Sequence, residues 1–385
     1  MNSAPGPTSS KNAVYVLGRF PPPVDGQTMA TQRLAGLLAP HYAVSRIDTS
    51  TGSAEHVQAD VRFSLGKVRH YARVRRAIRR ALQTSPAAPV LWASISPAPL
   101  GHLRDVLTVL PALQPSQPTY AVIHWGNFDR VFRHPLTAMT ARQLRQRLAG
   151  FVFLNGSLAE RCARWIPASR RLVIPNTIDE AVCCTDDEVT DKQARRTART
   201  AMRLLFLSNM IASKGYLDVL EAVGLLHARG LSLHADFVGR WASDDDRLAF
   251  EQRVAAVGLQ AVVTHHGGIT DRAHLKALYL GADVFLLPSY YPTEAQPLTI
   301  IEALNAGTPV VTTRHSGIPD MVRVGQDALF VPARAPEAIA EAVIRLADAA
   351  VWHAFSRHAR QQFQARFSPD AVGDRWLTLL ADAAT

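Results

Sequence analysis

The chain has 385 residues, 48% of them hydrophobic, and its formal net charge is +10 at pH 7. This length and apolar content suffice for a large buried core and favour two domains over one. No window approaches the roughly 18 uninterrupted apolar residues of a membrane span, and the N-terminus lacks the pattern of a signal peptide, so we expect a cytoplasmic protein.

Several common chemistries are excluded by patterns that the sequence lacks. The three cysteines, Cys162, Cys183 and Cys184, have no CxxC spacing, and no histidine pair has the spacing of metal ligands. We therefore expect no metal site. We also expect no other cofactor. Neither GxSxG nor HExxH occurs, which removes the commonest hydrolases.

The positive charge belongs to the first half of the chain. Residues 1–180 hold 22 Lys and Arg against 9 Asp and Glu, whereas residues 181–385 hold 20 against 23. The densest basic segment, 67–82, has the apolar spacing of a helix and is otherwise nearly all arginine. It suits an anionic membrane surface, with a merely solvated helix face as the alternative. No nucleic-acid-binding module accompanies it, so we expect no nucleic-acid partner.

Short apolar runs alternate with helical patterns along the chain. The runs typical of buried parallel strands are 13–18, 90–95, 120–125, 150–155 and 171–176 in the first half, and 203–208, 233–239, 262–267, 284–289 and 309–313 in the second. This alternation predicts an α/β protein with two doubly wound Rossmann-like domains. Ligands of such sheets bind beyond the carboxyl ends of the strands, which indicates a site in a central cleft.

The domain bounds follow from the same pattern. We expect an N-terminal domain over 1–184, a linker over 185–202 and a C-terminal domain over 203–368. The linker is predicted because its polar sequence has no apolar period. A C-terminal helix over 369–385 is expected to pack back on the N-terminal domain.

Candidate ligand-binding residues follow several of these strands. Lys214-Gly215 brings an ammonium and free backbone amides to a strand-to-helix turn, although a surface lysine is the alternative. Gly26, in a proline-stiffened loop, permits close approach of backbone to a ligand. His124 ends a strand and has either a hydrogen-bonding or a structural role. The aspartates of 243–247 are interpreted as a helix N-cap rather than an ion site.

Two carboxylates stand out in the stretch PTEAQPLTIIEALNAGTPVV, residues 292–311. A buried helix is predicted from Pro297 to Ala306, with proline at its first position and Gly307 at its end. Glu302 falls in the middle of this apolar helix, where burial of a carboxylate is costly unless a partner is present. Glu294 lies in the loop just before it.

This stretch resembles the retaining glycosyltransferases of family 4, which have the two-Rossmann GT-B architecture and two glutamates separated by seven residues. The resemblance extends in order over most of the chain. It includes IHWG (123–126), IPNTID (174–179), SNMIASKG (208–215), FVGRW (237–241), HGGI (266–269), ADVFLLPS (282–289) and SGIPDMV (316–322).

The resemblance implies a role for each candidate residue. Glu302 binds the ribose of a nucleotide-sugar donor, and Glu294 and His124 contact the transferred sugar. The donor diphosphate is bound by Lys214 and by the first amides of the helix. The remaining implied donor-binding residues are Gln296, Leu298, Thr299, Asn209, Gly268, Ile269 and Gly26. The family usually has an arginine at the position of Asn209 and a second glycine beside Gly26, so this chain departs from the family's pattern at both places.

The resemblance thus implies a metal-independent hexosyltransferase with retention of anomeric configuration. We expect a nucleoside diphosphate sugar donor, uridine being favoured over guanosine. The expected acceptor is a lipid-linked glycan of a bacterial surface polysaccharide. Two alternatives remain, a catalytically silent nucleotide-sugar-binding subunit and a nucleotide-sugar epimerase of the same architecture.

Overall fold

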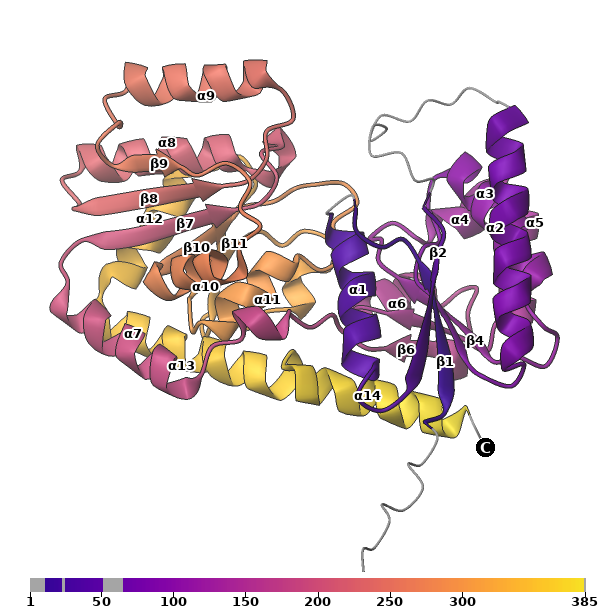
Figure 1. Cartoon of the computed structure of the whole chain (residues 1–385). Helices are drawn as coiled ribbons and strands as arrows, with labels where there is room; N and C mark the ends of the chain where they lie inside the picture. The colour runs from indigo at the N-terminus through magenta and orange to yellow at the C-terminus, as the bar shows by residue number, and fades with distance from the viewer. Residues whose placement is uncertain (1–10, 23–24, 51–64, 384–385) are drawn as a thin grey trace, which may run out of the picture. The chain divides into compact units, whose positions relative to one another are not determined.

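The computed structural model describes residues 11–22, 25–50 and 65–383 (Figure 1). The chain forms two compact units. The N-terminal unit comprises Met1–Leu154, Ala159–Ile174 and Gly373–Thr385, and the C-terminal unit comprises Asn155–Leu158 and Pro175–Val372. The final helix, α14 (Pro369–Asp382), therefore contributes most of its length to the N-terminal unit. Its Gly373 lies beside Leu37 of that unit.

The described part of the N-terminal unit contains a six-stranded parallel sheet of order β2-β1-β3-β4-β5-β6. Its strands are β1 (Ala13–Gly18), β2 (Ala43–Asp48), β3 (Val90–Trp92), β4 (Thr119–Ile123), β5 (Gly150–Phe153) and β6 (Arg171–Val173). Its helices are α1 (Gly26–Leu38), α2 (Leu65–Thr84), α3 (Pro99–Val109), α4 (Arg130–Arg133) and α5 (Ala138–Arg147); α6 (Gly156–Arg161) spans the boundary of the two units.

The described part of the C-terminal unit repeats this architecture, with the strand order β12-β11-β10-β7-β8-β9. Its strands are β7 (Met202–Leu207), β8 (Leu233–Val238), β9 (Val263–His265), β10 (Val284–Leu287), β11 (Val310–Thr312) and β12 (Ala328–Phe330). Its helices are α7 (Asp186–Ala198), α8 (Tyr216–Ala228), α9 (Asp244–Ala256), α10 (Arg272–Gly281), α11 (Leu298–Asn305), α12 (Pro336–Ala347) and α13 (Ala349–Arg366). Two doubly wound α/β domains were predicted, and the fold confirms them.

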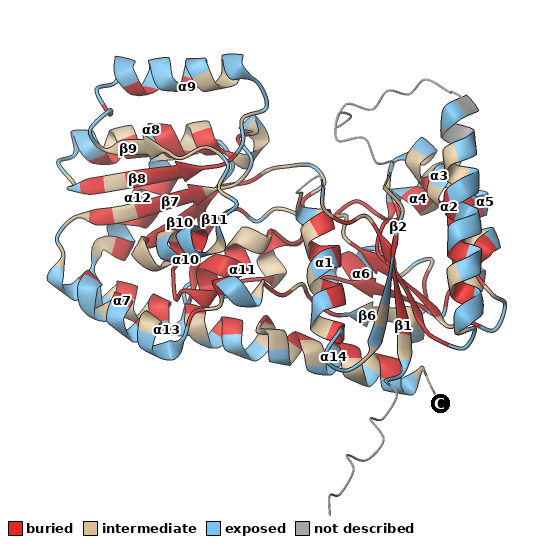
Figure 2. Cartoon of the chain, in the orientation of Figure 1, coloured by how far each residue is buried: buried red, intermediate tan, exposed pale blue. Residues whose placement is uncertain are grey.

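Each core lies on its sheet, whose central strands are buried on both faces (Figure 2). Every residue of β4, β5, β10 and β11 is buried, as expected for parallel strands covered by helices. The edge strands differ. β2 buries only Ile47, which explains why it has no apolar run from which to predict a strand; β12 was not predicted either.

The stretch 185–202 was predicted to be a linker, and this prediction is wrong, because most of the stretch forms α7 within the C-terminal unit. Thr185 caps the helix reciprocally with Glu188, which lies in an acidic first turn. The last turn is basic, so both ends of the helix complement the macrodipole. The missing apolar period has a local cause: α7 buries Val189 together with two cationic residues, Lys192 and Arg196.

Two other sequence interpretations can be compared directly with the structure. Ser243 caps α9 by accepting a hydrogen bond of 3.1 Å from the Asp246 amide, so the cap lies within 243–247 as predicted, but the aspartates form the first turn of the helix rather than its cap. The arginine-rich segment 67–82 is helical within α2, as predicted. In the described part of the chain, no helix is both long and apolar enough to cross a membrane.

Candidate functional site

Two loops meet at the carboxyl edge of the C-terminal sheet, one after β7 and one after β10. These strands are neighbours in parallel register, so their following loops leave the sheet side by side. The β7 loop brings Lys214 and the β10 loop brings Glu294, and the Lys214 Nζ atom lies 2.5 Å from Glu294 Oε2. The fold thus joins two predicted site residues that are far apart in the sequence.

The Lys214–Glu294 pair is enclosed by further contacts. Ser289 donates its hydroxyl to the same Glu294 oxygen at 2.9 Å, and the Lys214 ammonium lies 4.6 Å from the centre of the Tyr291 ring. The two charged side chains are only 13% and 8% exposed. A carboxylate held by two donors and an ammonium held by a carboxylate and an aromatic face have fixed positions, so both charges are pre-organised.

Gly215 explains how the β7 loop approaches so closely. Its φ of +85° lies in the left-handed region, and a Cβ atom there would come within 2.8 Å of the Pro288 carbonyl oxygen. Only glycine satisfies both conditions without strain. A hydrogen bond of 2.8 Å from the Tyr290 amide to the Ser213 carbonyl ties the same two loops together.

The chain from Glu294 to Gln296 is held from both sides. Ser316 donates its hydroxyl to the Glu294 carbonyl at 2.5 Å, and the Asn176 amide donates to Gln296 Oε1 at 2.7 Å. A Cβ atom on Gly317 would lie 2.1 Å from the Ala295 carbonyl oxygen, so this contact also requires glycine. The side-chain oxygen of Gln296 thus accepts a hydrogen bond from the backbone at Asn176, in addition to any role in ligand binding.

Glu302 lies on α11 with 5% of its surface exposed. Its Oε2 atom accepts a hydrogen bond of 2.9 Å from the Tyr279 hydroxyl of α10. Pro297 is the N-cap of α11 rather than its first helical residue, so the predicted helix is one residue too long at each end. Leu298 and Thr299 form the first turn, where the backbone amides have no helical acceptor.

Three further predicted donor-binding residues lie at the same edge of the sheet, Asn209 after β7 and Gly268 and Ile269 after β9. Asn209 is exposed and precedes Met210, whose amide donates to the Arg240 carbonyl at 2.8 Å. Gly268 is also exposed, and a Cβ atom there would lie 2.6 Å from Arg240 Cγ. Ile269 is partly buried against the core.

His124 directly follows β4 in the N-terminal unit. Its Nε2 atom is buried and has no hydrogen-bond partner among the described residues, and the same holds for Trp125 Nε1 and Asn127 Oδ1. Burial lowers the pKa of His124 to about 4, although the Asp25 carboxylate opposes this shift, so the imidazole is neutral at pH 7. Three unpartnered polar atoms at one strand end are unusual unless a ligand or water completes them.

Gly26 is exposed and begins α1, where the preceding Asp25 forms a capping box with Thr28. Residues 23–24 of the predicted glycine-proline loop lie outside the described residues.

Sequence reasoning missed the uncharged partners of the two glutamates. Ser289, the partner of Glu294, and Tyr291, whose ring faces Lys214, follow β10 in the stretch PSYYP. Tyr279, the partner of Glu302, lies in the last turn of an otherwise ordinary helix. Their position just past a buried strand is the one available signal for Ser289 and Tyr291. Nothing in the sequence around Tyr279 indicates a carboxylate partner.

No group of three or more His, Cys, Asp or Glu residues is placed to hold a metal ion within the described ranges.

Comparison with known proteins finds a family similarity in the C-terminal region. Residues 201–349 match the family model described as "Glycosyl transferases group 1". The putative colanic acid biosynthesis glycosyltransferase WcaL of Salmonella typhimurium is 27% identical over 46% of this chain and 45% of its own length. The amylovoran biosynthesis glycosyltransferase AmsK of Erwinia amylovora is 25% identical over 42% of this chain and 40% of its own length. The chain thus spans less than half the length of these curated relatives.

Solved structures extend the similarity in fold to nearly the whole chain. Anabaena Alr3699/HepE in complex with UDP and glucose has a TM-score of 0.70 at 14% identity, covering 96% of this chain and 99% of that one. Sucrose-phosphate synthase from Thermosynechococcus elongatus has a TM-score of 0.72 at 18% identity, covering 97% and 99%. These similarities confirm the GT-B fold.

Proposed function

We propose, because residues 201–349 match the model of the glycosyl transferases group 1, that the chain transfers a hexose from a nucleoside diphosphate sugar to a glycan. The transfer is metal-independent and retains the anomeric configuration. A uridine donor is favoured, since Anabaena HepE was solved with UDP and with UDP-glucose.

The observation that carries this proposal is the buried Lys214–Glu294 pair. In a nucleotide sugar, the phosphate oxygens and the sugar hydroxyls are neighbours across the anomeric bond. The Lys214 ammonium and the Glu294 carboxylate, fixed 2.5 Å apart, therefore complement the phosphate oxygens and the sugar hydroxyls, respectively. Lys214 binds the diphosphate and stabilises its charge as the leaving group departs, and Glu294 accepts hydrogen bonds from the sugar.

The remaining groups at the sheet edge suit the rest of the donor. The first amides of α11, on Leu298 and Thr299, supply donors for the diphosphate at a helix N-terminus. Glu302, oriented by Tyr279, accepts from the ribose hydroxyls. The exposed backbone at Gly268 and the adjacent Ile269 bind the base.

His124 contributes to sugar binding as a neutral imidazole. Its lowered pKa makes it a hydrogen-bonding group rather than an acid at pH 7, and its unpartnered Nε2 atom has capacity for a sugar hydroxyl or carbonyl. The neighbouring Trp125 and Asn127, whose buried Nε1 and Oδ1 atoms also have no partner in the described part of the chain, extend this candidate subsite.

The acceptor is a lipid-linked glycan of a surface polysaccharide, a proposal supported by the names of WcaL and AmsK. The membrane contact is made by α2. Its residues Val74, Ile78 and Leu82 are buried, which leaves arginines exposed on the other side of the helix (Figure 2). These are Arg69, Arg73, Arg75, Arg76, Arg79 and Arg80. Such a face attracts anionic lipid, so the protein is peripheral on the cytoplasmic side of a membrane.

The test is a donor-turnover assay on the purified chain with UDP-hexoses and GDP-hexoses, in excess EDTA and with added magnesium. We expect release of nucleoside diphosphate that is unaffected by EDTA, and a product with the donor's anomeric configuration. Donor binding without turnover identifies a silent subunit, and an epimerised donor identifies an epimerase. Turnover that EDTA abolishes and magnesium restores contradicts the metal-independent account.

A further inference from the structure

Lys192 is a lysine with no role in the site described above. It lies on α7 and is 3% exposed. Its Nζ atom donates to three uncharged oxygens: the Tyr279 carbonyl at 3.0 Å, the Ala306 carbonyl at 2.9 Å and Thr308 Oγ1 at 2.5 Å. An ammonium has three N–H donors, so these three oxygens satisfy it completely.

The two carbonyls belong to the C-terminal ends of two helices. Tyr279 lies in the last turn of α10, and Ala306 is the C-cap of α11. Carbonyls at a helix C-terminus lack helical partners and carry the negative end of the dipole, so a cation there is favourable. Thr308 also donates to the Tyr279 carbonyl at 3.1 Å, so two of the three acceptors of Lys192 are hydrogen-bonded to each other. One side chain from α7 therefore fastens the ends of α10 and α11 together.

The same two helices supply the hydrogen bond that orients Glu302. The Tyr279 hydroxyl from α10 donates to Glu302 Oε2 on α11 at 2.9 Å. Glu302 also lies one turn before the C-cap, since its own carbonyl accepts from the Ala306 amide at 3.3 Å. A shift of one helix end relative to the other would therefore move Tyr279 and Glu302 apart.

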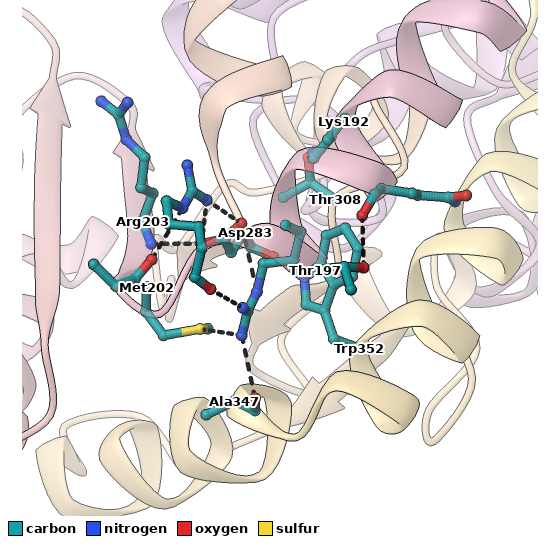
Figure 3. A network of polar contacts seen from close by, with 12 residues as sticks. Lys192, Thr197, Met202, Arg203, Asp283, Thr308, Ala347 and Trp352 are labelled. Carbon is teal, nitrogen blue, oxygen red and sulfur yellow. Dashed lines mark hydrogen bonds and ion pairs between the residues drawn. The ribbon is translucent and has the colours of Figure 1, made fainter.

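A separate network of polar contacts surrounds Asp283, and Figure 3 draws it in the same view as Lys192. Asp283 is 1% exposed and accepts from Arg199 at 2.5 Å, and Trp352 donates to its backbone carbonyl at 2.7 Å. Burial lowers the pKa of Lys192 to about 7, with Asp283 opposing the shift. A buried lysine is costly, and an apolar residue of similar volume usually stabilises a core as well or better. The three hydrogen bonds to the ends of α10 and α11 offset this cost.

We propose that Lys192 is a positioning residue for nucleotide binding, which sets the relative placement of α10 and α11 and so holds Glu302 against the donor ribose. This inference rests on the proposed function of Glu302. Lys192 does not touch the donor. Because it contacts the C-terminal end of α11 rather than the first amides of that helix, its effect on affinity passes mainly through Glu302.

The experiment is a double-mutant cycle that measures UMP and UDP dissociation constants by calorimetry. Lys192→Met keeps the volume and removes the donors. We expect it to weaken UMP and UDP binding by a similar factor of about ten, because both share the ribose. In the Glu302→Gln background, Lys192→Met should change affinity less than twofold, since interacting positions are non-additive.

Lys276→Met is the matched control. The Lys276 ammonium of α10 lies 2.7 Å from the Glu188 carboxylate of α7. Like Lys192, this ion pair links α7 to α10, but it is a pair at the surface and not a contact with α11. We expect this variant to bind both nucleotides like the wild type. If a urea titration shows that Lys192→Met does not fold, Thr308→Val is used instead, because it removes one acceptor of Lys192. It should weaken UMP and UDP binding equally, by a smaller factor, and have little effect in the Glu302→Gln background.

Additive effects of the two substitutions would overturn the inference, as would a loss limited to UDP or an equal loss in the Lys276 control. Each of these results leaves the proposed function intact. Failure of the wild-type protein to bind either nucleotide refutes the proposed function, and the inference with it.

Discussion

The Lys214 ammonium and the Glu294 carboxylate, 80 residues apart in the chain, lie 2.5 Å apart at the carboxyl edge of the C-terminal sheet. The contact depends on the neighbouring positions of β7 and β10 and on the left-handed Gly215. A pair of opposite charges that is preformed and mostly buried suits a ligand that combines anionic and hydroxyl groups.

Removal of Lys214 should lower both the affinity for the donor diphosphate and the stability of the fold, and the two losses can be measured separately. Lys214→Met leaves Glu294 without its cation, so we expect the free energy of unfolding to fall by about 1–3 kcal/mol. UDP affinity should fall about ten- to a hundredfold, and uridine affinity much less, because only the charge on the phosphates is lost. Urea titration and calorimetry measure the two effects.

The double variant Lys214→Met with Glu294→Gln serves as the control for this prediction. It should regain stability, since no unpaired carboxylate remains, without regaining UDP affinity. Equal losses of uridine and UDP affinity in the single variant would show that Lys214 does not bind the diphosphate.

The pH dependence of stability tests the environment of Lys192. Its pKa is about 7 in the folded chain, against 10.5 for an ordinary lysine. Between pH 7 and 10.5 the unfolded chain therefore binds a proton that the folded chain has lost. The free energy of unfolding of the wild type, relative to Lys192→Met, should therefore rise with pH from about 7 to 10. The slope can reach about 1.4 kcal/mol per pH unit. A difference that is flat or falls with pH would show that the ammonium is not desolvated.

The arginine face of α2 should bind anionic vesicles in a salt-dependent way. Replacing Arg73, Arg75, Arg76 and Arg80 by glutamine should reduce sedimentation with phosphatidylglycerol vesicles at low salt, without a change in UDP affinity. Arg79 is left in place because it donates to the Pro111 carbonyl at 3.0 Å. The measurement is the fraction of protein that sediments.

A matched variant carries the same charge change on the C-terminal unit. It replaces four exposed arginines by glutamine: Arg195, Arg253, Arg345 and Arg357. If both variants lose vesicle binding equally, net charge rather than α2 is responsible.

The sequence predicted the two domains and the charged residues that meet at the sheet edge, because parallel strands place their following loops together. It did not predict α7, since that helix buries Lys192 and Arg196 where a pattern of apolar residues would be sought. Such burial is possible only because distant carbonyls and carboxylates satisfy the charges, and no local pattern encodes those partners.

Within the candidate site, too, the sequence indicates the charged residues but not the residues that hydrogen-bond to them. Glu294 and Glu302 are conspicuous in an apolar stretch, so the sequence draws attention to them. Their hydrogen-bond partners Ser289 and Tyr279 are ordinary residues whose roles depend on how strands and helices pack. Partners of this kind become visible only in the folded chain.

The central claim is that Glu294 and Glu302 bind different parts of one donor, and the most direct test compares their glutamine variants. Glu302→Gln should mainly raise the donor KM and weaken UDP binding, because the ribose changes little during reaction. Glu294→Gln should mainly lower kcat and leave UDP affinity nearly intact. Each effect should be about ten- to a hundredfold in variants shown to fold. Loss of UDP affinity in the Glu294 variant but not in the Glu302 variant would contradict the assignment, and no change in either would place the donor site elsewhere.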